Sequence, residues 1–173
     1  MKTKNIGFWV VAVLIANLLA APAGNSQTEH FSASLFGDNE VPPINTAGTA
    51  DFQMTIGSTI TFSLTFSGLS SNLIFSHLHF APTKLAGGVM IFLCGGGGQP
   101  ACPAATHGTI TGTITAANVT GPTNQGIAPG DLNSALEAVR DGVSYANMHT
   151  TMFPAGEIRG QVRRGEGHDN GDE

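Results

Sequence analysis

The chain has 173 residues, of which 41% are hydrophobic and only 11% are charged, and its formal net charge at pH 7 is -5. Basic residues gather only near the C-terminus, as Arg159, Arg163 and Arg164, so the composition argues against nucleic acid as a partner. The length corresponds to one domain, large enough to bury a hydrophobic core.

The N-terminus has the pattern of a secretory signal peptide. Two lysines precede an apolar run (6–20) that is too short and wrongly flanked for a membrane span, and the small residues of an APA sequence follow it. We therefore expect a signal peptide over 1–23, a short mature segment over 24–30, and a secreted or periplasmic protein without a membrane span. An uncleaved membrane anchor is the alternative. Removing the two lysines leaves 5 basic against 12 acidic residues, a net charge of -7.

Short runs that alternate apolar and polar residues, separated by glycine and proline, indicate β-strands. The clearest are 48–56 and 59–69, which a Gly-Ser pair joins into a predicted β-hairpin. Further strands are expected over 30–36, 73–80, 88–93, 107–115, 143–150 and 156–163. Eight short strands in one domain predict a two-sheet sandwich or a barrel.

One helix interrupts this pattern, over 129–142. Asp131 is placed to cap it, leucine and valine recur at helical spacing, Arg140 falls in the last turn and Gly142 ends it. The apolar stripe is narrow, so the helix should lie across one opening of the sandwich. The end of the chain, 164–173, lacks apolar residues and is expected to be a disordered polar tail.

Only two cysteines occur, Cys94 and Cys102, at the ends of a glycine-rich loop. In an exported chain such a pair is expected to form a disulfide, because the compartment is oxidising. A metal site made of cysteine alone would need more ligands than two.

Three histidines are candidate metal ligands. His77 and His79 point to the same side of one predicted strand, with Cα atoms about 6.6 Å apart. The pair alone is a weak signal, and two solvated or hydrogen-bonded histidines would explain it equally well. His149 lies in another predicted strand that could neighbour the first. Three imidazoles are the smallest set that holds Zn²⁺ or Cu²⁺ with an open coordination position.

Other residues are candidates around this site. His107 is a possible fourth ligand, while His30 and His168 have weaker claims. Tyr145 and Asn147 share the predicted face of His149 and could orient it through a hydrogen bond.

Glu157 and Arg159 are further candidates beside the site. They alternate on one strand face, and an ion pair or rim charges explain them more simply than catalysis does. The chain has no G-x-S-x-G elbow and no Walker-type phosphate loop, so we assign no catalytic residue.

Four segments resemble the CHRD domain, a family first described in chordin and widespread in exported bacterial proteins. They are "GDNEVPP", "GTADF", "SHLHFAP" and "YANMHTTMFPAGEIRGQV", in that order over 31–163. The resemblance implies an immunoglobulin-like, Greek-key β-sandwich similar to Cu/Zn superoxide dismutase. His77 and His79 resemble the H-x-H strand of that copper site, and His149 resembles its C-terminal histidine. The zinc loop, the bridging histidine and the electrostatic loop have no counterpart, which argues against full dismutase activity.

Three functions follow as hypotheses. The preferred one is an exported binding module with a mononuclear copper site, or less readily a zinc site, built from the three histidines. The second is a dismutase-like copper oxidoreductase in which Arg159 steers the anion. The third is a structural or adhesive module of the cell envelope that binds no metal and contacts extracellular or envelope proteins.

Overall fold

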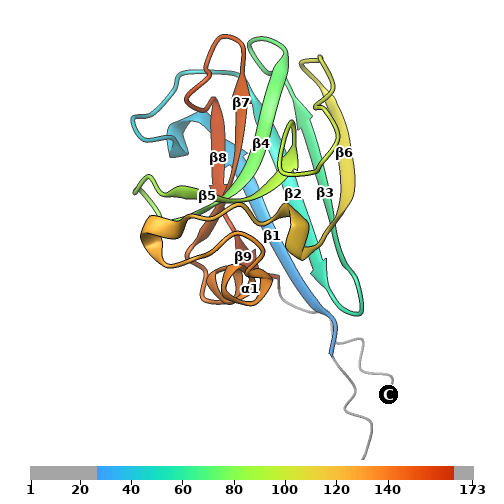
Figure 1. Cartoon of the computed structure of the whole chain (residues 1–173). Helices are drawn as coiled ribbons and strands as arrows, with labels where there is room; N and C mark the ends of the chain where they lie inside the picture. Colours follow the sequence, from blue (N-terminus) through green and yellow to red (C-terminus); the bar gives the residue numbers. More distant parts are fainter. Residues whose placement is uncertain (1–26, 166–173) are drawn as a thin grey trace, which may run out of the picture.

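A computed structural model describes residues 27–165 as a strongly curved antiparallel β-sheet with one α-helix (Figure 1). The predicted signal peptide, 1–23, and most of the predicted tail lie outside the described residues. The strands are β1 (Glu29–Phe36), β2 (Thr49–Ile56), β3 (Ile60–Ser67), β4 (Leu73–Phe80), β5 (Gly88–Cys94), β6 (Gly108–Ile114), β7 (Ser144–Thr150), β8 (Ile158–Gln161) and β9 (Arg163–Arg164). Three single-turn helices, η1 (Gly37–Asn39), η2 (Ala116–Asn118) and η3 (Thr123–Gln125), and the helix α1 (Leu132–Arg140) complete the fold.

All the strands belong to one sheet, in the order β5-β4-β7-β8-β1-β2-β3-β6, with β9 paired to β1. The sheet curls until its edge strands β5 and β6 come into contact, so it forms a nearly closed barrel. Around that circuit the order β3-β6-β5-β4 is a Greek-key pattern. The predicted all-β fold with one short helix is therefore confirmed.

The core lies between the two halves of the curled sheet. The predicted hairpin of β2 and β3 is present, with Phe52 opposite Leu64 and Ile56 opposite Ile60. Because side chains alternate along a strand, the apolar residues of both strands face inward and are buried. From the other half, Leu78 of β4 and Met148 of β7 join the same cluster.

The helix α1 lies at the lower end of the sheet in Figure 1, as its narrow apolar stripe predicts. The side chain of Asp131 accepts a hydrogen bond from the Ser134 backbone N–H at 3.1 Å, which confirms the predicted cap. Gly142 follows with φ +69°, a left-handed conformation that favours glycine. No helix among residues 27–165 is long and apolar enough to cross a membrane.

The ordered chain continues slightly beyond the predicted domain boundary. Arg164 was expected to belong to the disordered tail, but it lies in β9 and pairs with Glu29 at 2.6 Å. The sequence pattern missed this strand because only two residues form it. Val162, which is fully buried, anchors the segment before it.

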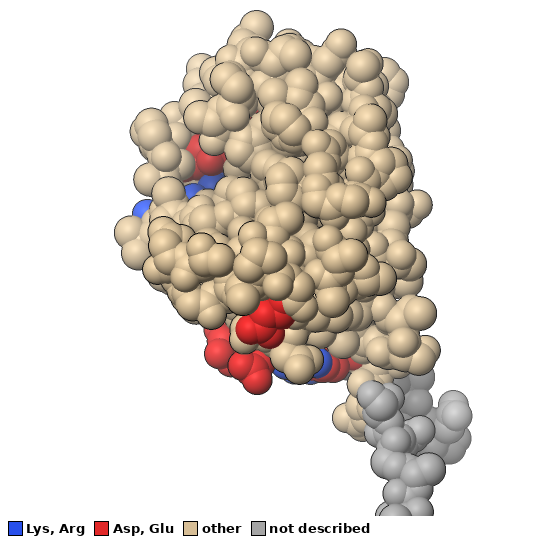
Figure 2. Space-filling model, in the orientation of Figure 1, with Lys and Arg blue, Asp and Glu red and all other residues tan. Residues whose placement is uncertain are grey.

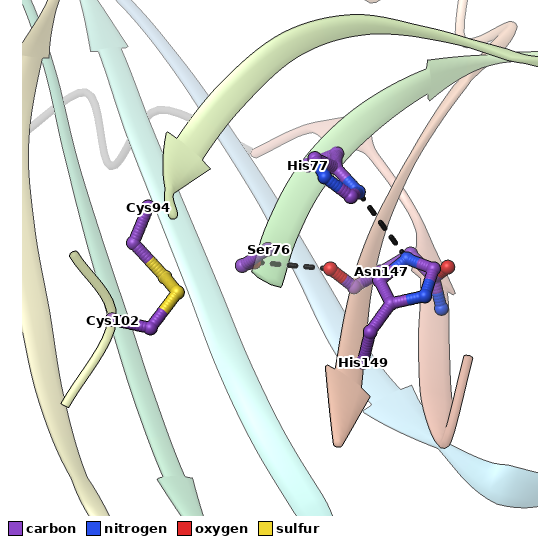
Figure 3. Close-up of a disulfide and its surroundings, with 6 residues drawn as sticks. All are labelled: Ser76, His77, Cys94, Cys102, Asn147 and His149. Atoms are coloured by element: carbon purple, nitrogen blue, oxygen red, sulfur yellow. Dashed lines mark hydrogen bonds between the residues drawn. A yellow bond between two sulfur atoms is a disulfide. The ribbon is translucent and has the colours of Figure 1, made fainter. Parts of the chain in front are cut away.

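The predicted disulfide between Cys94 and Cys102 is present. It joins the end of β5 to the loop that leads towards β6, close to where the two sheet edges meet (Figure 3). The disulfide therefore ties down one side of the nearly closed barrel.

A Cys94→Ser/Cys102→Ser variant should lose about 2–3 kcal/mol of unfolding free energy, as expected for so short a loop. Chemical denaturation of the variant and of the wild-type protein, with and without reductant, measures this loss. Reductant should destabilise only the wild type. Equal denaturation midpoints for the two proteins without reductant would contradict the prediction.

Candidate metal centre

The pairing of β4 with β7 brings the three candidate histidines together. In this register Phe75 lies opposite His149, and His77 lies opposite Asn147. His77 and His79 point away from the core on β4, because Leu78 between them faces inward. The prediction that these two strands are neighbours is thus confirmed.

The three imidazoles converge on one point. One ring nitrogen from each of His77, His79 and His149 lies within 4.8 Å of the others. Figure 3 shows the rings of His77 and His149 joined by a hydrogen bond, in which Nδ1 of His77 donates to Nε2 of His149 at 3.2 Å. Two nitrogens that ligate one tetrahedral zinc ion lie about 3.3 Å apart, given bonds of about 2.0–2.1 Å. The spacing therefore fits two ligands of a single ion.

Backbone carbonyls fix two of the rings. His79 donates from Nδ1 to the carbonyl of Gly87 at 3.0 Å, and His149 donates from Nδ1 to the carbonyl of Pro154 at 3.1 Å. Because a carbonyl can only accept, each neutral ring keeps a lone pair on Nε2. The Nε2 atom of His79 is buried and has no hydrogen-bond partner among the described residues. A buried nitrogen with a free lone pair in this cluster fits a metal ligand.

Burial keeps the cluster uncharged. Burial, together with the nearby His149 and His79, lowers the pKa of His77 to about 3. Burial is also the main cause that lowers the pKa of His79 to about 4, and it lowers the pKa of His149. Neutral imidazole is the form that binds a metal, so no proton has to be displaced at neutral pH.

Aromatic and cationic side chains surround the cluster. The ring of Tyr145 stacks on His79, with 4.7 Å between centroids and 3° between planes. The guanidinium of Arg159 lies over the same tyrosine ring, 4.2 Å from its centroid. Since β7 lies between β4 and β8, Tyr145 lies between the side chains of His79 and Arg159. Its hydroxyl also accepts from the N–H of Gly87, the residue whose carbonyl orients His79.

Asn147 does not orient His149, contrary to our expectation. Its amide donates to the carboxylate of Glu40 and to the carbonyl of Ile158, and the carbonyl of Pro154 takes the orienting role. The physical reason is that the β7–β8 turn folds back over the ring of His149.

Glu157 and Arg159 do not form an ion pair with each other, and they are not rim charges. Both are buried, at 0% and 4% exposure. Glu157 instead accepts hydrogen bonds from Thr46, Ser70 and Thr150.

His107 lies apart from the cluster. It is exposed at the start of β6 and is not one of the three grouped residues. Among the described residues the grouped ligands are His77, His79 and His149, so the structure does not bring His107 to the site as a fourth ligand. His30 is also elsewhere, on β1 beside Thr55, and His168 lies outside the described residues.

Sequence reasoning missed the groups that position the rings. The carbonyls of Gly87 and Pro154 act through the backbone, so their residue types carry no signature of the role. Phe92, whose ring meets His77 edge-on at 4.4 Å, reads in the sequence as an ordinary strand residue. Glu40 was visible only as part of the "GDNEVPP" segment.

Fold and site together define an all-β domain with a Greek-key sheet and three buried histidines that could hold one metal ion. The family model of the CHRD domain matches residues 31–162, and the chain belongs to that family. No curated protein and no solved structure matches the chain significantly.

Proposed function

We propose that this CHRD domain is an exported binding module that holds a single metal ion with His77, His79 and His149. The main support is the buried Nε2 of His79, which has no hydrogen-bond partner within residues 27–165 and belongs to a ring grouped with those of His77 and His149. Leaving such an atom unpaired costs free energy, and a metal ion would satisfy it. The disulfide is consistent with an oxidising compartment, either outside the cell or in the periplasm.

Copper is the preferred ion. Imidazole suits both copper and zinc, and the intrinsic order of affinities for such donors favours Cu²⁺ over Zn²⁺. Three protein nitrogens leave a further coordination position for water or an exogenous ligand. The three histidines would therefore bind the ion and leave one coordination position open to water or another ligand.

The test is the stoichiometry of metal uptake. The purified protein should retain about one equivalent of Cu²⁺ after dialysis, because one cluster supplies three ligands. The triple variant His77→Ala/His79→Ala/His149→Ala should retain none while its circular dichroism stays that of a folded β protein. A triple His→Gln variant repeats the test with less change in volume.

A matched control replaces the same kind of residue outside the cluster. The variant His30→Ala/His107→Ala removes two exposed histidines and should still retain one equivalent. Equal uptake by the wild type and both triple variants would overturn the proposed site.

Metal binding should also stabilise the fold. At a free-ion concentration a hundredfold above Kd, the unfolding free energy should rise by about 2.7 kcal/mol, because only the folded state assembles the site. Thermal unfolding with Cu²⁺ and with a chelator measures this shift. An unchanged Tm would favour the structural or adhesive module.

The dismutase-like alternative requires the open position to take part in turnover. Superoxide consumption by the copper-loaded protein tests it directly. A rate no higher than that of the same copper concentration in buffer would leave metal binding without catalysis.

A further inference from the structure

A pocket of ≈ 480 Å³ is lined by Arg159, whose guanidinium lies over the ring of Tyr145, the residue that stacks on His79. Its walls come from the segment after β1, from the β4–β5 loop and from β8. In Figure 2 acidic and basic side chains meet at this left edge of the molecule, while the surface above and beside it carries almost no charge. Pockets of this volume are typical of sites for small organic molecules.

Arg159 is the buried cation of this pocket. Its side chain is 4% exposed, yet its only hydrogen bond among the described residues goes to the carbonyl of Leu85, at 3.1 Å. No carboxylate within the described chain forms a salt bridge with it. A guanidinium has five N–H donors in a planar fork, so the others remain free to meet a ligand in the pocket that Arg159 lines.

Three further charged residues line the pocket, namely Lys84, Glu40 and Asp38. Lys84 stands in the β4–β5 loop with φ +67°, a left-handed conformation that is uncommon for a residue with a side chain. Burial raises the pKa of Glu40 to about 7, against the lowering effects of Asn147 and Arg159. Glu40 therefore offsets the two cations only in part at neutral pH, and Asp38 is exposed.

The rest of the lining is partly apolar. Val41 and Pro43 also line the pocket. A ligand with one anionic end and an apolar body would contact both kinds of surface.

We propose that this pocket binds a small organic carboxylate, whose two oxygens accept hydrogen bonds from Arg159 while Lys84 adds a positive charge and the body of the ligand contacts Val41 and Pro43. Arginine is suited to this role because its fork matches the two oxygens of a carboxylate. The site does not include the three histidines, so binding should occur with or without a bound metal.

Benzoate is a suitable probe, since it combines a carboxylate with an apolar ring, and benzamide is its uncharged counterpart. In a titration of the ¹⁵N-labelled protein in chelator, benzoate should give saturable shifts centred on residues 38–43, 83–85 and 159–161. Benzamide should bind at least about tenfold more weakly, because it lacks the charge-assisted pairing. Equal affinities, or shifts away from these segments, would overturn the proposal. Saturable binding of inorganic phosphate without binding of benzoate would also overturn it.

Variants provide the second arm of the test. Arg159→Met keeps an unbranched apolar stem against Tyr145 and should weaken benzoate binding at least about tenfold. Lys84→Met, at an exposed loop residue, should weaken it several-fold. The control Arg164→Met removes an exposed arginine that does not line the pocket and pairs with Glu29 instead, and it should bind benzoate like the wild type. If Arg159→Met fails to fold, Lys84→Met and the benzoate–benzamide comparison decide the outcome. Unaltered affinity in Arg159→Met or in Lys84→Met would refute the assigned contacts.

Discussion

Glu157→Ala is expected to lower the free energy of unfolding by about 3–5 kcal/mol, because it removes the charged acceptor of the buried Thr150 hydroxyl and of the partly buried hydrogen bonds from Thr46 and Ser70. The carboxylate is completely buried. One oxygen accepts from Thr46 Oγ1 at 2.7 Å and from the backbone N–H of Ser70 at 2.8 Å, and the other accepts from Thr150 Oγ1 at 2.6 Å. These bonds tie the β1–β2 and β3–β4 loops to the end of β7, next to His149. Urea denaturation at neutral pH measures the loss.

The pH dependence of this loss identifies the ionised carboxylate as its cause. Burial raises the pKa of Glu157, but the hydrogen bonds from Thr150, Thr46 and Ser70 outweigh it and hold the pKa below the usual value of 4.5. A lowered pKa in the folded state stabilises above the unfolded pKa, and this contribution disappears as the pH falls through the folded value. The difference between Glu157→Ala and wild type should therefore shrink below about pH 4.5.

Glu157→Gln is the matched control for shape. It keeps the side-chain volume and one acceptor, so it should lose less stability than Glu157→Ala. An alanine variant as stable as the wild type at pH 7 would show that water replaces the carboxylate without cost.

The strands β1, β2 and β3 could be predicted because their side chains alternate between a buried and a solvated face. The hairpin of β2 and β3 is the clearest case, since every second residue from Ala50 to Ile56 and again from Ile60 to Phe66 is apolar and buried. The two-residue strand β9 could not be predicted, because a period cannot be detected over two positions. Its placement depends on contacts with Glu29 and Phe31, which are distant in the sequence.

The histidine cluster was predictable for a related reason. His77 and His79 share a face through strand geometry, and only the neighbourhood of β4 and β7 had to be guessed. The orienting groups were not predictable, because they are the carbonyls of Gly87 and Pro154. Any residue type supplies a carbonyl, so only the path of the loop decides where it points.

The environment of Arg159 could not be predicted from the sequence. Its alternation with Glu157 suggested an ion pair, but the two side chains are stabilised separately, one by hydroxyl groups and the other by the ring of Tyr145. The β-strand period places two residues on one face without specifying which loop covers each of them. The pocket beside Arg159 depends on two such loops, and the sequence pattern therefore gave no sign of it.

Glu40→Gln is expected to stabilise the protein above pH 7 by about 3 kcal/mol and to leave its stability near pH 4.5 unchanged. Burial raises the pKa of Glu40 from 4.5 to about 7 in the folded state. Such a group stabilises the fold fully below the unfolded pKa, and the contribution is lost as the pH rises through the folded pKa. Glutamine resembles the protonated acid and still offers an oxygen to the amide of Asn147. The variant therefore escapes the cost of burying the ionised form.

The difference in unfolding free energy between Glu40→Gln and the wild type does not contain the contributions of the other titrating groups, because both proteins share them. The three histidines have lowered pKa values, so their contribution to stability is present above their unfolded pKa and is lost as the pH falls. This dependence has the opposite sign but is shared by Glu40→Gln and the wild type, as is the dependence from Glu157. Urea denaturation in chelator between pH 4.5 and pH 8 should thus give a difference that grows with pH and levels off above about pH 7. A constant difference would mean that the pKa of Glu40 is the same in the folded and unfolded states, and Glu40 would then add a full negative charge to the pocket at pH 7.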